Sequence, residues 1–396
     1  MKLAILTDYI PPHKTGGLGK VALDIYSYLK KDQNKKIEPY LITTGPPGRE
    51  AKDKVFLSAN INAAYLMKSF IRLPEILSDF DVVHVHQSVN AFFLKRLMQK
   101  KKRPAVFATF HSSKRKERRQ LKSIKVENMA VKLSSREFLR KQVHYNIHIA
   151  ADNLLAHSAD YISAVSKKTK NDIMSDYKLK SPIEVIPNGI APDIFSPAVS
   201  AEPIIRQYGL EKKKIILALA APKISKRPIS ALLSFKIILK ELPNSVLLMA
   251  GSIKDDKAYY NTIKGLIRQA GLEGKVIISG AGADDMAALY AAADVVIMPS
   301  VYENMPLGLL EAMASGRPVV CADYGGADEV ITAGVDGVIV RPDDVGGMSQ
   351  AAIVLLNDKK RASNVGRAAR EKMVRKFAFD DIIKKYIRVY EQLAAD

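Results

Sequence analysis

Two glutamates eight positions apart, Glu303 and Glu311, have the types and spacing that could do chemistry. The segment that contains them predicts a loop, a short helix that ends at Gly316, and a β-branched strand that begins near Pro318. Glu303 lies in the predicted loop and Glu311 about one turn inside the helix. Because a helix start has unpaired N–H groups and a partial positive charge, it can hold a phosphate. Carboxylates on either side of it suit sugar and ribose hydroxyls, which predicts a nucleotide-sugar site.

Three cations, Lys223, Lys226 and Arg227, follow one predicted strand and precede a predicted helix. Their ammonium and guanidinium groups could clamp a diphosphate, although solvated surface charge is the alternative. The carboxyl ends of parallel strands form the binding edge of such a sheet, and this favours phosphate. Gly16 and Gly17 occupy the equivalent place after the first predicted strand, where backbone can approach an anion. An ordinary flexible loop explains the glycine pair equally well.

Histidines end two predicted strands of the first half. His111 follows the strand 105–110, where an imidazole could move a proton or bond a sugar hydroxyl or an acceptor phosphate. His84 and His86 end the neighbouring strand, and we expect His84 to be structural. From position alone, a structural role is also the commoner outcome for His111.

The elements that must position these residues form two similar series of alternating strands and helices. This alternation is typical of doubly wound parallel sheets, and it predicts two Rossmann-like domains with a cleft between them. A Pro187-Asn188-Gly189 turn and the prolines that follow it predict the boundary. We therefore expect domains at 1–195 and 196–376. The predicted strands are 3–7, 38–42, 82–85, 105–110, 160–165 and 183–186, then 214–219, 246–250, 275–278, 295–298, a run from 318, and 337–340; the predicted helices include 18–30, 63–77, 89–100, 114–157, 167–177, 228–242, 257–270, 285–292 and 380–394.

The composition is that of a globular protein of 396 residues, with 47% hydrophobic and 26% charged residues. The single cysteine, Cys321, excludes an internal disulfide and fits a reducing compartment. We expect neither a signal peptide nor a transmembrane helix, and hence a cytoplasmic protein.

The net charge of +20 is concentrated in the first half of the chain. Residues 1–190 contain 34 Lys and Arg against 17 Asp and Glu, whereas residues 191–396 contain 27 against 24. The first half is therefore expected to face an anionic partner, either a membrane surface, a phosphorylated acceptor or nucleic acid. The basic, helical stretch 114–142 fits a helix on the inner face of a membrane, and a solvated helix is the alternative. Nucleic acid is disfavoured because no recognised binding motif or stacking platform is found.

Over nearly its full length the chain resembles the retaining GT-B glycosyltransferases of glycosyltransferase family four. The resemblance rests on MKLAILTDYIPPHKTGG, DVVHVHQ, ATFH, ADYISAVS and VIPNGIAPDIFSP in this order, and above all on Glu303-x7-Glu311 followed by EAMASGRPVV and GGADEVI. It implies a nucleoside diphosphate sugar as donor, no metal cofactor, and a C-terminal helix, 377–396, that packs back on the N-terminal domain.

The resemblance also implies roles for single residues. Glu311 would bind the ribose hydroxyls, and Glu303 the hydroxyls of the donor sugar. Lys226 would neutralise the leaving diphosphate, with backbone N–H groups near Leu307 and Gly308 as further donors. Gly16 would approach the phosphates from the other domain, and His111 would lie near the donor sugar and acceptor.

Two departures from the family pattern affect the phosphate clamp. The family often has a Gly-Arg pair before the lysine, whereas this chain has Ala220-Ala221, so that Lys223 or Arg227 would substitute. Pro306 follows the first glutamate and has no N–H, which leaves the donors to Leu307, Gly308 and Leu309.

The expected function is retaining transfer of a sugar to a lipid-linked or anionic acceptor in cell-envelope glycoconjugate synthesis. Two alternatives stay open. One is a degenerate protein of this fold that binds nucleotides or anions without catalysis, and the other is a synthase with a soluble sugar acceptor.

Overall fold

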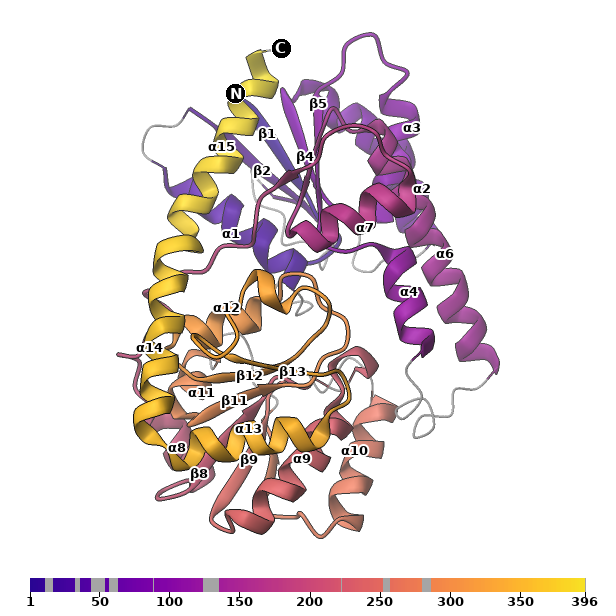
Figure 1. The fold of residues 1–396 in the computed structure, drawn as a ribbon. Helices are drawn as coiled ribbons and strands as arrows, with labels where there is room; N and C mark the ends of the chain where they lie inside the picture. The colour runs from indigo at the N-terminus through magenta and orange to yellow at the C-terminus, as the bar shows by residue number, and fades with distance from the viewer. Residues whose placement is uncertain are drawn as a thin grey trace. The chain divides into compact units, whose positions relative to one another are not determined.

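The structure is a computed structural model, and it describes residues 1–10, 17–32, 36–43, 54–56, 63–87, 89–123, 135–221, 223–251, 257–279 and 286–395. The chain divides into two compact units (Figure 1). Unit 1 comprises residues 1–118, 133–188 and 382–396, and unit 2 comprises 189–381 together with the stretch around 119–123.

Unit 1 is built on a parallel sheet of seven strands in the order β3-β2-β1-β4-β5-β6-β7. The order reverses at β1, which pairs with β2 on one side and β4 on the other. That reversal is the switch point at which doubly wound sheets bind ligands. The strands are β1 (Lys2–Leu6), β2 (Glu38–Thr43), β3 (Lys54–Phe56), β4 (Val82–His86), β5 (Ala105–Phe110), β6 (Tyr161–Ala164) and β7 (Glu184–Val185).

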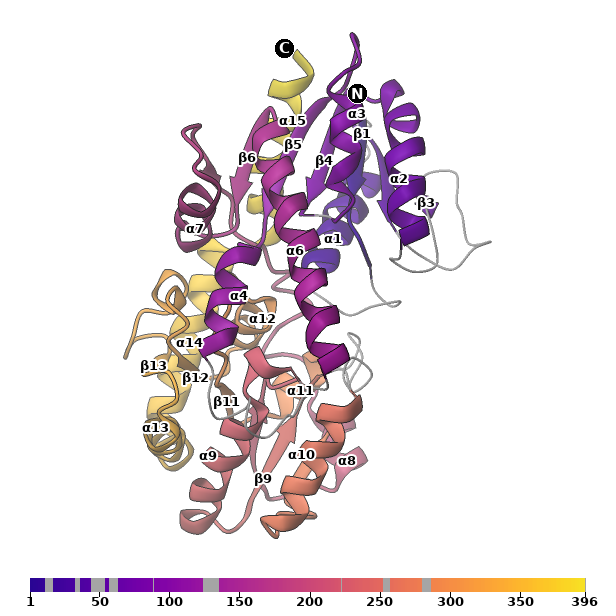
Figure 2. The same cartoon turned by 90° about the vertical axis from the view of Figure 1, so that its right-hand side faces the viewer.

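Helices cover both faces of this sheet (Figures 1 and 2). One face packs alternate strand residues, such as Val83 and Val85, against apolar side chains such as Leu94 and Leu155. On the other face His84 and Phe107 contact Tyr386 and Tyr390 of the last helix. The helices of this part of the chain are α1 (Gly17–Lys31), α2 (Ala63–Ile76), η1 (Leu77–Asp79), η2 (Val89–Phe93), α3 (Leu94–Leu97), α4 (Lys114–Ser123), α6 (Ser135–Ser158), α7 (Lys167–Tyr177) and α15 (Phe379–Ala395).

Unit 2 contains a parallel sheet of six strands in the order β10-β9-β8-β11-β12-β13. Here the order reverses at β8, which pairs with β9 and β11. The strands are short, apolar and mostly buried, as is typical of a parallel sheet covered on both faces. They are β8 (Lys214–Ala218), β9 (Ser245–Met249), β10 (Val276–Ile278), β11 (Val295–Met298), β12 (Val319–Ala322) and β13 (Val338–Val340).

The main core of unit 2 lies between the sheet and a layer of helices that supplies Phe235, Ile263 and Ile353. Gly316 and Gly366 allow two other helices to come close together, because a Cβ at Gly366 would lie 2.0 Å from the carbonyl oxygen of Gly316. The helices are α8 (Glu202–Tyr208), η3 (Ile224–Lys226), α9 (Pro228–Glu241), α10 (Lys257–Gln269), α11 (Met286–Ala292), α12 (Leu307–Ala314), η5 (Ala327–Glu329), α13 (Val345–Asn357) and α14 (Lys359–Lys376).

The prediction of two doubly wound, Rossmann-like parallel sheets is confirmed. The differences are local. The strand β3 and the helix α8 were not predicted, and the expected helix 89–100 is a 3-10 turn followed by the short helix α3. The predicted helical stretch 114–157 contains two helices, α4 and α6, and residues 124–134 between them lie outside the described residues.

Candidate functional site

The site in unit 2 lies where the strand order reverses, between β8 and β11. The loop after β8 carries Lys223 and Lys226, and the loop after β11 carries Glu303. These loops are joined by a hydrogen bond of 3.0 Å from the backbone N–H of Val301 to the carbonyl of Ser225. Since adjacent parallel strands end at one edge of a sheet, two residues far apart in sequence are brought into contact there.

Lys226 and Glu303 form an ion pair and hydrogen bond between Nζ and Oε1. The Glu303 side chain is 12% exposed and that of Lys226 is 31% exposed. An ammonium group and a carboxylate thus reach the same small region, with the ammonium more accessible to a ligand. The pair can present one positive group and one hydroxyl acceptor to a phosphorylated sugar.

The helix α12 begins four residues after Glu303. Its N-cap is Pro306, whose carbonyl accepts hydrogen bonds from the N–H groups of Leu309 (3.1 Å) and Leu310 (3.3 Å). Leu309 was expected to donate to phosphate, but its N–H already bonds to this carbonyl. The first helical positions, Leu307 and Gly308, precede the residues bonded in this way, so that their N–H groups can point to a ligand.

Glu311 lies on the buried side of α12 and is 7% exposed. Its Oε2 accepts a hydrogen bond of 3.0 Å from the hydroxyl of Tyr290, which also lies 3.1 Å from the carbonyl of Gly308. Burial and the carboxylate of Glu311 raise the pKa of Tyr290 well above its ordinary value, so that the phenol stays protonated and donates. Tyr290 therefore connects Glu311 to the first turn of α12, a role that no sequence signal indicated.

The other two predicted cations differ in their surroundings. Lys223 is exposed at the entry of η3. Arg227 is 2% exposed, its Nε donates to Ser230 Oγ at 3.2 Å, and it forms an ion pair with Asp343. Its guanidinium is thus occupied within the protein, and we assign it a positioning role at the start of α9.

Two buried hydroxyls that the sequence did not single out lie near Glu303 in the chain or in space. Ser300 Oγ and the Tyr324 hydroxyl have no hydrogen-bond partner among the described residues. Burial raises the pKa of Tyr324 most, followed by the Cys321 thiol and then by carboxylates, of which Glu303 comes first. Both residues follow strands at the same edge of the sheet, so their unused hydroxyls are further candidates for polar contacts there.

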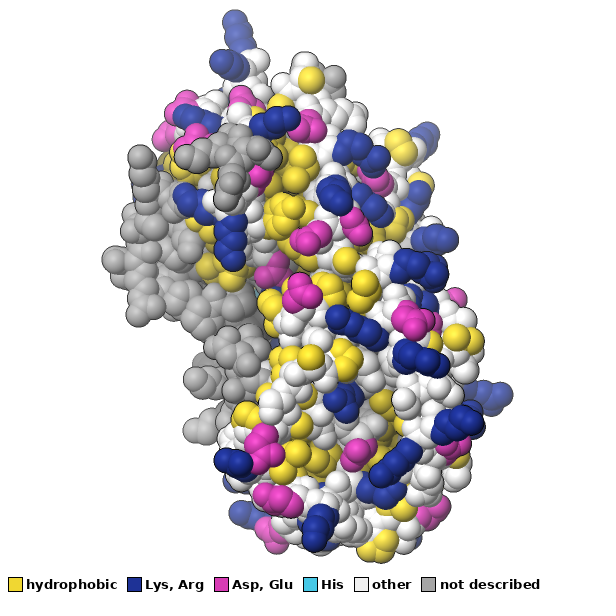
Figure 3. Space-filling view, turned by 90° about the vertical axis from the view of Figure 1, so that its left-hand side faces the viewer, with side chains coloured by type: hydrophobic (Ala, Val, Ile, Leu, Met, Phe, Trp, Pro, Cys, Tyr) yellow, Lys and Arg dark blue, Asp and Glu magenta, His cyan; other side chains and the backbone are white. Residues whose placement is uncertain are grey.

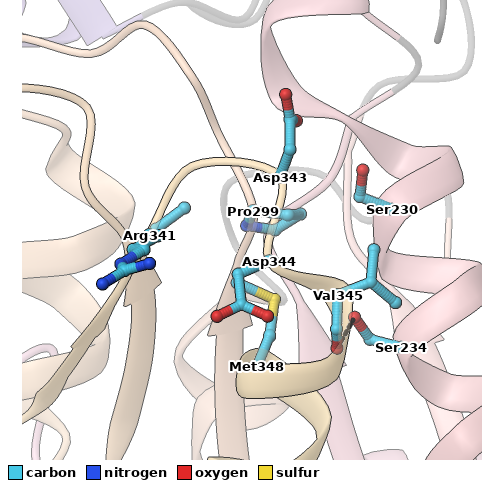
Figure 4. A pocket seen from close by; sticks show the side chains of 9 residues that line it. Ser230, Ser234, Pro299, Arg341, Asp343, Asp344, Val345 and Met348 are labelled. Atoms are coloured by element: carbon cyan, nitrogen blue, oxygen red, sulfur yellow. Dashed lines mark hydrogen bonds between the residues drawn. The ribbon is translucent and has the colours of Figure 1, made fainter.

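Asp343, the ion-pair partner of Arg227, lines a small hollow at the carboxyl ends of the strands (Figure 4). Its volume is about 10 Å³, which is room for about one water molecule and not for a nucleotide. In Figure 4 Arg341 lies on the opposite side of the hollow from Ser230 and Ser234, and Ser234 Oγ donates to the carbonyl of Val345 at 3.4 Å. We assign the hollow a structural role between α9 and α13.

In unit 1, His84 has the surroundings of a structural residue. Its Nδ1 lies 2.7 Å from the Tyr390 hydroxyl, its Nε2 lies 2.7 Å from Thr109 Oγ1, and its ring stacks on Phe107. The side chain is fully buried, and burial lowers the pKa of its imidazole well below the ordinary value. A neutral ring with both nitrogens bonded holds β4 to α15.

His86 and His111 form a pair at the carboxyl ends of β4 and β5. His86 Nδ1 lies 3.1 Å from His111 Nε2, and one ring nitrogen of the pair donates to the other. Burial, and next the ammonium of Lys114, lower the pKa of His111 to about 3. At neutral pH His111 is therefore a neutral hydrogen-bonding group and no imidazolium acid.

A buried polar network holds the backbone at His111. Gln87 Oε1 accepts hydrogen bonds from the N–H groups of His111 (3.0 Å) and Ser112 (2.9 Å), while its Nε2 donates to Asp152 at 3.1–3.2 Å. Burial raises the pKa of Asp152 to about 6, although the charge of Lys114 and several hydrogen bonds act against it. Gln87 was not among the predicted site residues, and the signal that could have identified it is its polar side chain directly after β4 at the switch point.

Gly16 lies outside the described residues, and Gly17 begins α1 as an exposed residue. In the basic stretch 114–142, Arg118 of α4 bonds Asn146 and Gln142 of α6 at 2.8 and 2.5 Å.

The described ranges contain neither a membrane-spanning helix nor a cluster of metal ligands. No helix there is both long and apolar enough to span a bilayer. Nor do those ranges contain a group of three or more His, Cys, Asp or Glu placed to hold a metal ion.

Two family models match the chain one after the other. Residues 15–194 match Glycosyltransferase Family 4, and residues 200–372 match Glycosyl transferases group 1. The second match contains Lys226, Glu303 and Glu311, and the first contains His111.

Similar proteins include an uncharacterized glycosyltransferase of Methanocaldococcus jannaschii, which is 30% identical over 61% of this chain. The match covers 64% of that relative, less than two thirds of its length. The N-acetyl-alpha-D-glucosaminyl L-malate synthase of Bacillus anthracis is 25% identical over 100% of this chain and 98% of the relative. Among solved structures, the sucrose-phosphate synthase of Thermosynechococcus elongatus has a TM-score of 0.81 at 18% identity, covering 100% of this chain and 99% of the other. This last likeness shows a shared fold.

Proposed function

The chain is a GT-B glycosyltransferase with a Family 4 half and a group 1 half, and we propose that it transfers a sugar from a nucleoside diphosphate sugar with retention of configuration. The observation that supports this most directly is the Lys226–Glu303 pair beside the start of α12. It provides a cation, a carboxylate and two backbone donors in one region of unit 2.

In this proposal the diphosphate binds to the cationic and N–H groups. The ammonium of Lys226 leaves Glu303 and bonds the phosphate nearest the sugar, while the N–H groups of Leu307 and Gly308 bond phosphate oxygens. As the bond between sugar and diphosphate breaks, negative charge grows on the leaving group. Groups already in place for that charge stabilise the transition state, commonly the largest electrostatic contribution in such sites.

The two glutamates then hold the two ends of the donor. Glu303, released from Lys226, accepts hydrogen bonds from sugar hydroxyls and lies on the side where an oxocarbenium-like positive charge develops. Glu311, oriented by Tyr290, accepts hydrogen bonds from the ribose hydroxyls. Neither carboxylate needs to carry a proton, which distinguishes this arrangement from a general acid–base pair.

For the acceptor we propose an anionic molecule held by the basic first half of the chain. The excess of Lys and Arg in residues 1–190 supports this, and the relative from Bacillus anthracis is named for a product that contains malate, a dicarboxylate. His111 would bond an acceptor or sugar hydroxyl as a neutral imidazole. Acceptors on a membrane surface are the lipid-linked version of this proposal, and co-sedimentation with anionic liposomes tests it.

The experiment for the donor combines binding and turnover. A thermal-shift panel of UDP-, GDP- and ADP-sugars identifies the base, and proton NMR of the turnover product reads its anomeric configuration. We expect Glu303→Ala and Glu311→Ala to lose turnover while a control variant of an exposed glutamate, Glu241→Ala, keeps it. Full donor turnover in both folded site variants would refute the proposal, and an inverted anomer would refute retention.

A further inference from the structure

A hollow on unit 2 lies at the amino ends of its strands, whereas the Lys226–Glu303 pair lies at their carboxyl ends. Its volume is about 840 Å³, within the range of small-molecule sites. It is bounded by the segments that lead into β8, β11 and β12, represented by Lys214, Asp294 and Pro318. Lys226 and Glu303 follow the carboxyl ends of β8 and β11, so the hollow is a separate place in the same unit.

The lining of this hollow is strongly cationic. It includes Lys212–Lys214, Arg317, Lys359, Arg367 and Arg370, and Asp294 is the carboxylate that lines it. Figure 3 shows Lys and Arg side chains exposed on the side of unit 2 that carries α14, the helix that supplies the last three of these cations. A site with this excess of positive charge attracts anions.

The hydrogen bonds of these cations leave most of their charge uncompensated. Lys213 Nζ donates to Asn244 Oδ1 at 2.8 Å, Arg317 to the carbonyl of Ala293 at 3.1 Å, and Arg367 to Asn364 Oδ1 at 3.3 Å. All of these acceptors are neutral.

Arg370 likewise bonds only neutral acceptors among the described residues, and more of them. Its guanidinium bonds three backbone carbonyls, those of Pro192, Phe195 and Ala314, at 2.7–2.9 Å, which fixes the cation in place. Two carboxylates act on the cluster electrostatically, Asp294 on Arg317 and Asp193 on Arg370, and both are exposed. The cations therefore still outnumber the carboxylates widely.

A second observation points to a ligand at the same place. Ser315 lines the hollow and is 1% exposed, yet its Oγ has no hydrogen-bond partner among the described residues. Arg317 Nε is likewise buried there without a partner among them. A hydroxyl and a guanidinium N–H left unused in a buried position are costly, and an anion with several oxygens would satisfy both.

We propose that this hollow, the Ser315–Arg367 site, binds an anion with two or more phosphate groups. The half-buried guanidinium groups of Arg317 and Arg370 suit contact with phosphate oxygens, and the exposed Lys359 and Arg367 add charge. Free oligophosphate and the phosphate chain of a nucleotide share this chemistry. The proposal does not depend on the reaction proposed above.

Isothermal titration with inorganic tripolyphosphate tests the site on the full chain. The variant Lys359→Gln/Arg367→Gln removes two exposed cations from the site, and Lys236→Gln/Lys240→Gln removes two exposed cations from α9 as a matched control. We expect the first pair to weaken binding by about fivefold or more and the control by less than about twofold. Equal weakening in both would show general attraction to a basic protein and overturn the proposal.

Two further variants distinguish binding at this site from general attraction to positive charge and from binding at Lys226. Ser315→Ala keeps every charge and is expected to weaken tripolyphosphate binding about threefold, since it removes one hydrogen bond. Lys226→Gln is expected to leave one tripolyphosphate site of unchanged affinity. Unchanged affinity in Ser315→Ala, or loss of all binding in Lys226→Gln, would overturn the proposal.

Parallel titrations with a nucleoside triphosphate identify the source of the anion. Tighter binding than that of tripolyphosphate indicates a nucleotide, and equal or weaker binding indicates a free oligophosphate.

Discussion

The ammonium of Lys226 and the carboxylate of Glu303 are ion-paired, although 77 positions separate them in the chain. Each group thus satisfies the other. A diphosphate that takes the ammonium must separate the pair, so the two residues report on donor binding in opposite directions.

Glu303→Gln is therefore expected to strengthen the binding of a nucleoside diphosphate while it slows transfer. The amide removes a carboxylate that competes for Lys226 and repels phosphate. Partly exposed ion pairs contribute about 0.2–1 kcal/mol, so we expect up to about fivefold tighter binding by calorimetry. Transfer should fall by about 100-fold or more because the developing positive charge loses its carboxylate.

The matched variant for that measurement is Lys226→Gln, which should weaken both diphosphate binding and transfer. If Glu303→Gln bound the nucleoside diphosphate more weakly than wild type, the competition between the carboxylate and phosphate would be disproved.

How far the sequence predicts this site is seen in the pairing of Lys226 with Glu303. Both residues follow predicted parallel strands, and such strands end at a shared edge, so their approach could be inferred from the alternation of elements alone. The burial of Arg227 could not be inferred. It depends on Asp343, which lies after β13, and a Lys-Arg dipeptide before a helix has the appearance of exposed charge.

The elements that the sequence did not predict are short. The helix α8 has seven residues and β3 has three, and neither length allows a hydrophobic period to be recognised. Tyr290 shows the same limit for the site. Its hydroxyl reaches Glu311 only because α11 packs beside α12, and local sequence does not specify that contact.

Tyr290→Phe is expected to raise the KM for the donor by about fivefold with little change in kcat. The substitution removes the hydroxyl that orients Glu311, a loss of about 1 kcal/mol in ribose binding that is shared by ground state and transition state. Steady-state kinetics measure it. Tyr260→Phe, on the partly exposed part of α10, is the control and should leave both constants unchanged. A fall in kcat with constant KM would instead place Tyr290 in the chemical step.

Acid is expected to destabilise unit 1 through its buried histidines. The folded-state pKa of His111 is about 3, below the ~6.5 of an unfolded histidine. Between these values the unfolded chain binds more protons, so the free energy of unfolding falls as pH falls, by up to about 1.4 kcal/mol per pH unit. His84 and His86 act in the same direction.

Asp152 opposes this trend over a narrower range. Its folded pKa of about 6 lies above the unfolded value of about 3.8, so the folded state binds the extra proton and gains stability as pH falls from 6 to 3.8. Urea unfolding between pH 7 and pH 4.5 should show a shallower loss in His111→Asn than in wild type or in His157→Asn, an exposed histidine of α6. Equal slopes in all three proteins would contradict the low pKa of His111.

Two glycines in helices of unit 2 should respond in opposite ways to alanine. In Gly366→Ala of α14 the new Cβ would lie 2.0 Å from the carbonyl oxygen of Gly316, so α14 must move away from the turn after α12. We expect a loss of about 1–3 kcal/mol in the free energy of unfolding. Gly265 of α10 has nothing within 4 Å of the position of a Cβ, and alanine there should stabilise the protein by about 0.5–1 kcal/mol through the helix backbone.

Thermal melts of the two variants measure the difference in stability between them. A Gly366→Ala variant as stable as wild type would show that α14 and the Gly316 turn are not in close contact, because no side-chain adjustment can relieve an overlap between a Cβ and a backbone carbonyl.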